Sequence, residues 1–242
     1  MILTIYLIIL IYFVLGGIGF YLINRKKDPL VARKSYVKFG TYFLIVHILF
    51  FSIVLDPVAF SYLGLIIIAF GFYELFQLFR SHGYQSKGFF LGSLFIFMLL
   101  AAGFYRFTGL QKELILFSFL ILSIFDSFSQ ITGQLWGKRK ILPRVSPNKT
   151  LGGLIGGFIV AMASALLLHN LYAKPPFELL LMAAGVVVFA FAGDLAASLY
   201  KRRYQVKDYS NLIPGHGGVL DRFDSLIAGG AWVTCSAYML NF

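Results

Sequence analysis

Long apolar runs recur along the whole chain and set its predicted architecture. Eight of them predict helices, at residues 2–23, 40–60, 62–79, 89–107, 113–134, 151–171, 177–200 and 218–240. Each run is close to the ~20 residues that a helix needs to cross ~30 Å of hydrocarbon. The alternating pattern of a membrane β-barrel is absent from the sequence. We therefore predict an all-α, polytopic membrane protein with about eight transmembrane helices.

The first run is expected to remain as a span, because it is too long for a signal-peptide core and lacks both a basic leader and a small-residue cleavage site. No low-complexity linker or internal repeat divides the chain. We expect one membrane domain over residues 1–242. Residues 1–112 would be mainly helical scaffold, because motif-like polar residues concentrate in 113–242.

Basic residues are unevenly distributed between the loops. The cation-rich loops follow the first, third, fifth and seventh predicted helices, at residues 25–38, 80–87, 138–149 and 201–207. Loops on the other side hold only Arg106, Lys112 and Lys174. By the positive-inside rule, the cation-rich side is cytoplasmic and both termini lie outside, as expected for a protein of the cell (inner) membrane.

Composition narrows the functional classes. Hydrophobic residues make up 59% of the chain and charged residues only 13%, which excludes an ordinary soluble domain. The net charge of +11 does not indicate nucleic-acid binding, because the cations sit in short juxtamembrane loops where topology and anionic lipid headgroups account for them. Glu74 lies inside the third run, where it could reach water, pair with Arg80 or have a function.

The densest group of chemically capable residues begins at Gly193-Asp194 and ends at Asp224-Ser225. Asp221 and Asp224 are three residues apart, so on a helix they share a face and can hold hard cations, with Asp194 completing the site. Magnesium suits such carboxylates, and manganese is an alternative. The glycine-rich run 214–218 offers backbone amides that could meet phosphate at a helix start. Nearby cations complete a predicted polyphosphate pocket: Lys201, Arg202, Lys207 and Arg222.

Two further segments carry polar groups. Ser146-Pro147-Asn148-Lys149-Thr150 precedes the sixth helix, and its side chains suit a phosphate or a nucleotide base, although the segment could be only a helix cap. The following glycines, at 152–153 and 156–157, favour close helix packing. Asp126 begins a polar stripe near the inner end of the fifth helix and could contact metal or substrate.

The segment Ser198 to Asp224, S-L-Y-K-R-R-Y-Q-V-K-D-Y-S-N-L-I-P-G-H-G-G-V-L-D-R-F-D, resembles the signature of the CDP-diacylglycerol synthases, or phosphatidate cytidylyltransferases. The S-P-N-K-T segment and Asp126 extend the resemblance over 120–242. The resemblance implies a membrane enzyme, expected to be a homodimer, that condenses CTP with phosphatidate and releases pyrophosphate. It also implies magnesium around Asp194, Asp221 and Asp224. The residues that it places around the phosphates are Lys201, Arg202, Lys207, Asp208, His216 and Arg222.

The candidate roles follow from these patterns. Catalytic candidates are Asp221, Asp224, Lys201, Lys207 and Asp208. Substrate-binding candidates are Asp126, Ser146, Asn148, Lys149, Thr150, Arg202, His216, Gly217, Gly218 and Arg222.

Two acids typical of the family are missing, because Gly152 and Ala197 stand in their positions. We expect this difference to slow turnover of phosphatidate or to redirect the enzyme to another lipid phosphate. Alternatives are CTP-dependent chemistry on an isoprenoid phosphate, an ether-lipid phosphate or a polyprenol, or a non-catalytic scaffold or transporter. A transporter is disfavoured because the polar groups lie at one interface and in one half of the chain.

Overall fold

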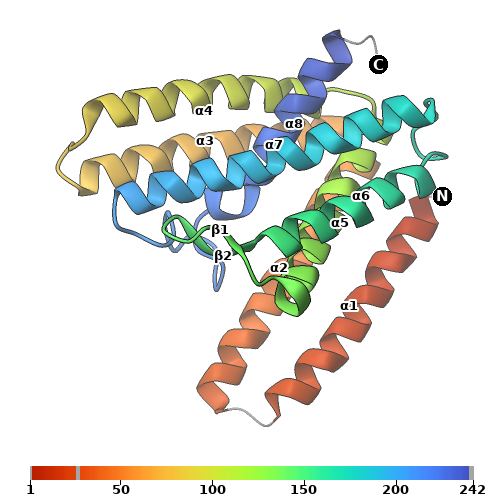
Figure 1. The fold of residues 1–242 in the computed structure, drawn as a ribbon, viewed down its shortest axis with the longest axis horizontal. Helices are drawn as coiled ribbons and strands as arrows, with labels where there is room; N and C mark the ends of the chain where they lie inside the picture. Colours follow the sequence, from red (N-terminus) through yellow and green to blue (C-terminus); the bar gives the residue numbers. More distant parts are fainter. Residues whose placement is uncertain (1, 26–27, 240–242) are drawn as a thin grey trace.

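The computed structural model describes residues 2–25 and 28–239, and within them it confirms an all-α membrane fold with helices at the eight predicted places (Figure 1). Lys26, Lys27 and the predicted helix end at residue 240 lie outside this range. The elements are α1 (Ile2–Asn24), α2 (Pro29–Leu55), α3 (Pro57–Ser81), α4 (Lys87–Thr108), α5 (Lys112–Trp136), β1 (Lys140–Leu142), β2 (Ser146–Thr150), α6 (Leu151–Leu167), α7 (Pro176–Arg203) and α8 (Leu220–Met239).

Five of the helices in the described part of the chain are long and apolar enough to cross a membrane, by length and composition: α2, α3, α4, α5 and α7. Helix α6 is shorter than predicted and ends at Leu167 rather than at residue 171. Polytopic insertion is therefore supported, whereas the predicted number of about eight spans remains a prediction.

Helix α2 begins at Pro29, well before the predicted start at residue 40. The side chain of Asp28 accepts hydrogen bonds from the backbone N–H groups of Leu30 and Val31, and Pro29 occupies the first helical position. The cations at 33, 34 and 38 suggested a loop, but they are compatible with a helix that extends beyond the hydrocarbon. Lys38 is therefore a helical residue, which matters for the site.

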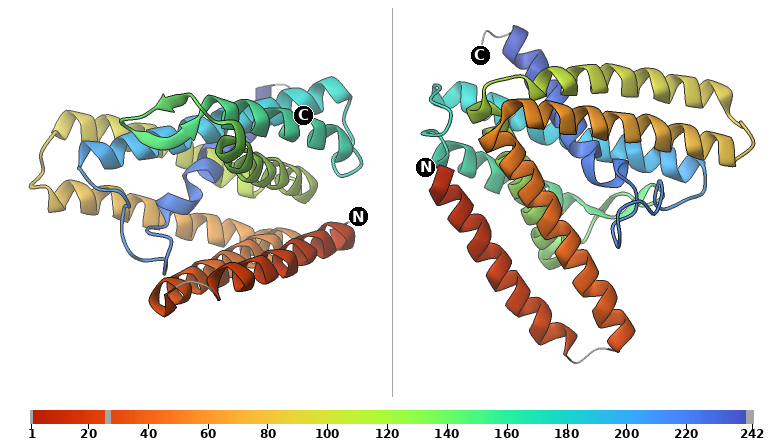
Figure 2. Two further views of the ribbon diagram at one scale, coloured as in Figure 1. Left: turned by 60° about the horizontal axis from the view of Figure 1, so that its bottom comes forward. Right: turned by 180° about the vertical axis from the view of Figure 1, so that it is seen from behind.

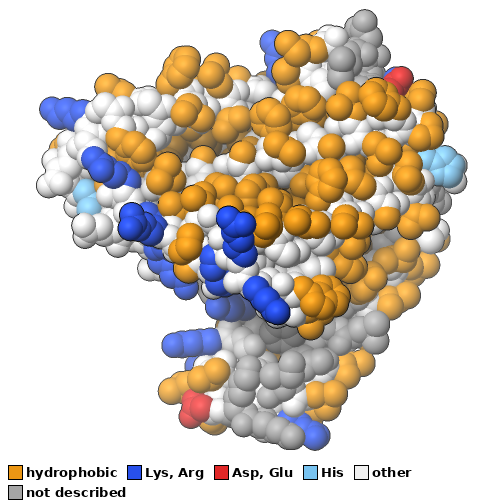
Figure 3. All heavy atoms as spheres, viewed as in Figure 1, with side chains coloured by type: hydrophobic (Ala, Val, Ile, Leu, Met, Phe, Trp, Pro, Cys, Tyr) orange, Lys and Arg blue, Asp and Glu red, His pale blue; other side chains and the backbone are white. Residues whose placement is uncertain are grey.

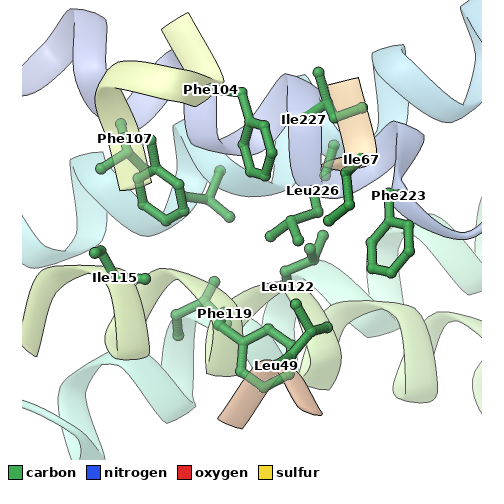
Figure 4. Packing of buried hydrophobic residues seen from close by; sticks show 14 of the residues in the cluster. Leu49, Ile67, Phe104, Phe107, Ile115, Phe119, Leu122, Phe223, Leu226 and Ile227 are labelled. Atoms are coloured by element: carbon green, nitrogen blue, oxygen red, sulfur yellow. The ribbon is translucent and has the colours of Figure 1, made fainter. Parts of the chain in front are cut away.

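Helix α8 packs against α3, α4, α5 and α7, so it forms the centre of the bundle. Its apolar residues Phe223, Leu226 and Ile227 meet Phe104 of α4 and Leu122 of α5 in one buried cluster (Figure 4). Close approach of α4 and α8 depends on small residues, because a Cβ added to Gly103 would lie 2.8 Å from the Cβ of Ala231. This packing fixes the start of α8, where the motif residues lie.

The predicted glycine packing face of α6 is confirmed. A Cβ at Gly153 would lie 2.6 Å from the carbonyl oxygen of Ser129, and a Cβ at Gly157 would lie 2.9 Å from that of Phe125. Both contacts are made with α5, so the two helices run in direct backbone contact. This brings Asp126 on α5 and the β1–β2 hairpin, which precedes α6, to one end of the bundle.

The surface divides by residue type. In Figure 3 hydrophobic side chains cover the helices of this face, whereas Lys and Arg side chains gather over the β1–β2 hairpin and the nearby helix ends. Helix α1 and the first part of α2 project from the other helices in the ribbon views (Figures 1 and 2), whereas Leu49, Phe50 and Ile53 of α2 are buried in the core. Arg203 at the end of α7 donates to the Ser86 hydroxyl in the α3–α4 loop at 3.0 Å, so two of the cation-rich segments meet.

Candidate active site

Helices α7 and α8 place two carboxylates beside each other. Gly193 of α7 lies directly against α8, where an added Cβ would be 2.9 Å from the carbonyl oxygen of Asp224. The following residue, Asp194, interacts electrostatically with the side chain of Asp224. Asp194 also pairs with Lys149 from β2 and accepts a hydrogen bond from Ser198. The Gly193-Asp194 pair therefore brings the α7 carboxylate to the α8 site.

Asp221 is held by other groups of the same motif. One carboxylate oxygen pairs with the Nζ of Lys201 at 2.5 Å, and the other accepts from the backbone N–H groups of Tyr209 and Gly218, each at 2.8 Å. The side chain is only 2% exposed. Asp221 thus ties α7, the 204–219 loop and α8 together, and both of its oxygens already have partners.

Glu74 of α3 has a structural role that differs from the predicted alternatives. Its buried carboxylate accepts hydrogen bonds from the backbone N–H groups of Val219 and Leu220, each at 2.8 Å, and from the Ser210 hydroxyl at 2.6 Å. It therefore caps the N-terminus of α8 rather than reaching water or pairing with Arg80. The signal was an acid in an apolar run, but its partner lies 145 residues away in the sequence.

The prediction that the glycine-rich run offers free amides to phosphate is wrong for the start of α8. The N–H groups of residues 218–220 are taken by the carboxylates of Asp221 and Glu74. Gly218 lines neither cavity described below, and a Cβ there would collide with the Glu74 carboxylate. Gly218 is therefore required for packing, and its contact with a substrate stays a prediction.

The segment before α6 forms the second strand of an antiparallel hairpin, and it also caps the helix as predicted. The Thr150 hydroxyl accepts a hydrogen bond from the N–H of Gly153 at 3.1 Å. Arg202 of α7 donates to the carbonyl oxygen of Val145 at 3.2 Å and to that of Val206 at 2.9 Å. The guanidinium of Arg202 thereby anchors the hairpin turn over the carboxylates.

These elements enclose a cavity of about 930 Å³. Every predicted site residue lines it except His216, Gly217 and Gly218. It brings together Asp126 from α5, the hairpin side chains of Ser146, Asn148, Lys149 and Thr150, and the motif residues Asp194, Lys201, Arg202, Lys207, Asp208, Asp221, Arg222 and Asp224. The residues that sequence reasoning missed include Gln134, Lys140 and Phe191. Gln134 could have been found, because it follows Gln130 by one helical turn.

His216 and Gly217 line a smaller neighbouring cavity of about 350 Å³ with Lys38 of α2. Partial burial lowers the pKa of the His216 imidazole, and the adjacent Arg222 cation lowers this pKa further. The imidazole is therefore mainly neutral at pH 7. It can serve as a hydrogen-bonding group beside the phosphate-binding cations.

The carboxylates fit a magnesium ion in part. Within residues 2–25 and 28–239, no group of three or more His, Cys, Asp and Glu side chains is gathered closely enough to hold a metal. The predicted trio is not assembled because Asp221 is turned to Lys201 and two backbone amides. Asp194 and Asp224 face the same cavity, and Asp194 would hold the ion while it keeps Lys149 as a neighbour. Two carboxylates are sufficient for Mg²⁺, whose remaining ligands are usually water and substrate phosphate oxygens.

Comparison with known proteins agrees with this geometry. A sequence model described as the cytidylyltransferase family matches residues 110–240, which carry the hairpin, Asp126 and the whole motif. The chain belongs to the cytidylyltransferase family. Residues 110–240 of the chain include every lining residue of the larger cavity, from Phe125 to Ser225.

The chain is also similar to curated proteins named phosphatidate cytidylyltransferase. It is 46% identical to the protein of Bacillus subtilis over 105 residues, 42% of this chain and 39% of that protein. It is 39% identical to the Staphylococcus epidermidis protein over 126 residues, 51% of this chain and 48% of the relative. It is 40% identical to the Haemophilus influenzae protein over 121 residues, 48% of this chain and 42% of that relative. The chain thus spans less than half the length of these three relatives.

Proposed function

We propose that this chain is a membrane cytidylyltransferase that condenses CTP with a lipid phosphate, namely phosphatidate, to give CDP-diacylglycerol and pyrophosphate. The observation that carries the proposal is the larger cavity at the helix ends, where carboxylates of α5, α7 and α8 face cations of the hairpin and the 201–222 motif. Family membership and the names of the relatives support the same reaction.

The reaction joins two anions, so its main requirements are charge cancellation and in-line positioning. A phosphate oxygen of the lipid attacks the α-phosphorus of CTP, a new P–O bond forms, and the bond to the β-phosphate oxygen breaks as pyrophosphate leaves. The nucleophile needs no strong base, because a phosphomonoester has a second pKa near ~6 and is mostly dianionic at pH 7. Lys207 and Arg222 are exposed in the cavity and can meet the phosphates.

Lys201 and Lys149 have a different role from these two exposed cations, because each is paired with a carboxylate. They hold Asp221 and Asp194 in place and reduce the repulsion between those acids and the substrates. Magnesium, held by Asp194 and Asp224, would neutralise phosphate charge and orient phosphate oxygens. Manganese could replace it. The Ser146 and Asn148 side chains on the hairpin are suited to a phosphate or the nucleotide base.

The site is proposed to face the cytoplasm of a bacterial cell membrane, with the lipid tails in the bilayer and both termini outside. In support of this orientation, two of the cation-rich loops, 138–149 and 201–207, line the larger cavity. Labelling Lys174→Cys in a Cys235→Ser background tests this orientation. Reaction of that cysteine only from the inside would contradict it. Homodimer formation remains a prediction.

Pyrophosphate release from CTP by the purified protein tests the reaction itself. The lipid panel should contain phosphatidate, an ether-lipid phosphate, an isoprenoid phosphate and a polyprenol, each with magnesium and with EDTA. We expect release with phosphatidate and loss of release with EDTA. Release only with another lipid phosphate would reassign the substrate, and no release with any lipid would contradict cytidylyl transfer.

A further inference from the structure

The smaller cavity adjoins the larger one, because the two share Lys207, Asp208 and Arg222 as lining residues. Its far wall is formed by Lys38 of α2 and the loop at 213–217. Residues 1–109 lie outside the family match, so Lys38 is a contribution from the part of the chain that the family model does not cover. The site thus includes a residue from outside the 198–224 motif and outside the matched region.

The charge of this second cavity is strongly positive. Lys38, Lys207 and Arg222 line it with one carboxylate, Asp208, and none of the three cations forms an ion pair within the described part of the chain. All three are exposed to solvent in the structure. By contrast, Lys149 and Lys201 of the larger cavity are neutralised by Asp194 and Asp221. The smaller cavity therefore has uncompensated positive charge that favours an anion.

Packing fixes Lys38 in this position. The Thr41 hydroxyl, three residues further along α2, donates to the carbonyl oxygen of Pro214 at 3.1 Å. Gly215 has a φ of +76°, and a Cβ there would lie 2.9 Å from the Cγ of Lys38. The first part of the lysine side chain lies directly on the glycine loop, so the exposed ammonium extends from a fixed point at the wall of the cavity. Lys38 is one of three α2 cations in the described segment 33–38, and it is the one that lines the cavity.

We propose that the smaller cavity is a phosphate-binding subsite completed by Lys38, and that it holds a phosphate group of one substrate beside the reaction centre. The inference rests on the proposed function for the identity of the ligand. Two sources share the required chemistry: the β and γ phosphates of CTP, which leave as pyrophosphate, and the phosphate of the lipid. Lys207 and Arg222, shared by both cavities, would contact phosphates on either side.

Three variants test the subsite. Lys38→Met removes the charge and keeps the stem that packs on Gly215, and Lys38→Arg restores the charge. Lys34→Met removes another exposed cation from α2, one turn earlier and outside both cavities, so it is the matched control. For each protein the measurements are the KM for CTP, the KM for phosphatidate, kcat, and the affinity for magnesium pyrophosphate by calorimetry in detergent micelles.

We expect Lys38→Met to raise one KM by about tenfold or more, the loss expected for one charge-assisted contact, with kcat changed less than threefold. Lys38→Arg and Lys34→Met should resemble the wild type. A raised KM for CTP with weakened pyrophosphate binding assigns the subsite to the triphosphate. A raised KM for phosphatidate with unchanged pyrophosphate binding assigns it to the lipid.

If both KM values and the pyrophosphate affinity of Lys38→Met stay within about twofold of the wild type, the subsite does not exist. The same holds if Lys34→Met has an equal effect, because the charge would then act from a distance. Failure of the proposed function looks different: the wild type would release no pyrophosphate with any lipid. Binding of pyrophosphate and of short-chain phosphatidate then decides, and a subsite is supported only if Lys38→Met weakens one of them tenfold.

Discussion

The two halves of the chain have similar apolar helices but use their polar residues differently. In the C-terminal half, α5, the hairpin, α7 and α8 bring carboxylates and cations to one cavity. In the N-terminal half, α1 and the first part of α2 project from the bundle (Figure 2). Many large hydrophobic side chains of α1–α4 are exposed. On this basis residues 1–112 would be a passive scaffold.

Three polar side chains of the N-terminal half nevertheless reach the site. Glu74 caps α8, Thr41 bonds to the glycine loop, and Lys38 lines the smaller cavity. The residues that face the larger cavity therefore all come from the C-terminal half. The residues that hold its surroundings in place come from both halves.

Asp221→Asn should have the largest effect. It leaves Lys201 buried without a counter-charge and weakens the bonds to two backbone amides, which we expect to cost about 3–5 kcal/mol of stability as well as activity. Unfolding in mixed micelles of increasing SDS measures the loss. Glu178→Gln, which removes an exposed pair with Lys174, is the control and should cost less than about 1 kcal/mol. Equal stability of the two variants would contradict a structural role for Asp221.

Asp224→Asn should lower kcat by about 100-fold or more with nearly wild-type stability, because its carboxylate faces the cavity and its only hydrogen bond in the described residues is to the adjacent N–H of Ser225. Steady-state pyrophosphate release measures the change, and the magnesium requirement should rise. Full turnover would remove Asp224 from the metal assignment. The substitutions Asp221→Asn and Asp224→Asn, one helical turn apart, would then differ only in their effect on stability.

Glu74→Gln should lower stability by about 1–3 kcal/mol, because an amide is a weaker acceptor for the two N–H groups that Glu74 caps. Its effect on kcat should follow from displacement of α8 rather than from lost chemistry. Glu113→Gln in the first turn of α5 is the matched control. If Glu74→Gln abolished turnover with unchanged stability, Glu74 would belong to the chemistry and the N-terminal half would be catalytic.

The sequence predicted the helices and most of the larger cavity, because apolar length and the long motif are local signals. It could not predict the ion pair between Asp221 and Lys201. Each of the two side chains could equally contact a substrate, and only the distance between them in the structure shows that they pair with each other. The Glu74 cap joins residues 145 positions apart and has no local signature. The early start of α2 could not be predicted, because a cation-rich helical segment outside the hydrocarbon has the same composition as a juxtamembrane loop.

The smallest effect is expected from restoring the two missing acids with Gly152→Glu and Ala197→Glu. Neither residue lines the larger cavity, and a Cβ at Gly152 would lie 3.0 Å from the carbonyl oxygen of Trp136. The structure therefore gives a reason to expect a weaker effect than the family pattern suggested, within about threefold in phosphatidate turnover. A tenfold gain would show that these positions reach the substrates.

Transfer of isotope from CTP tests the central claim most directly. The purified protein would be given phosphatidate and magnesium with CTP labelled either at the α-phosphate or at the γ-phosphate, and the lipid fraction would be counted. We expect label in the lipid from α-labelled CTP only, in a product that co-migrates with CDP-diacylglycerol, and no label with Asp224→Asn. Label from the γ-phosphate would indicate a kinase, and no label from either would contradict cytidylyl transfer to phosphatidate.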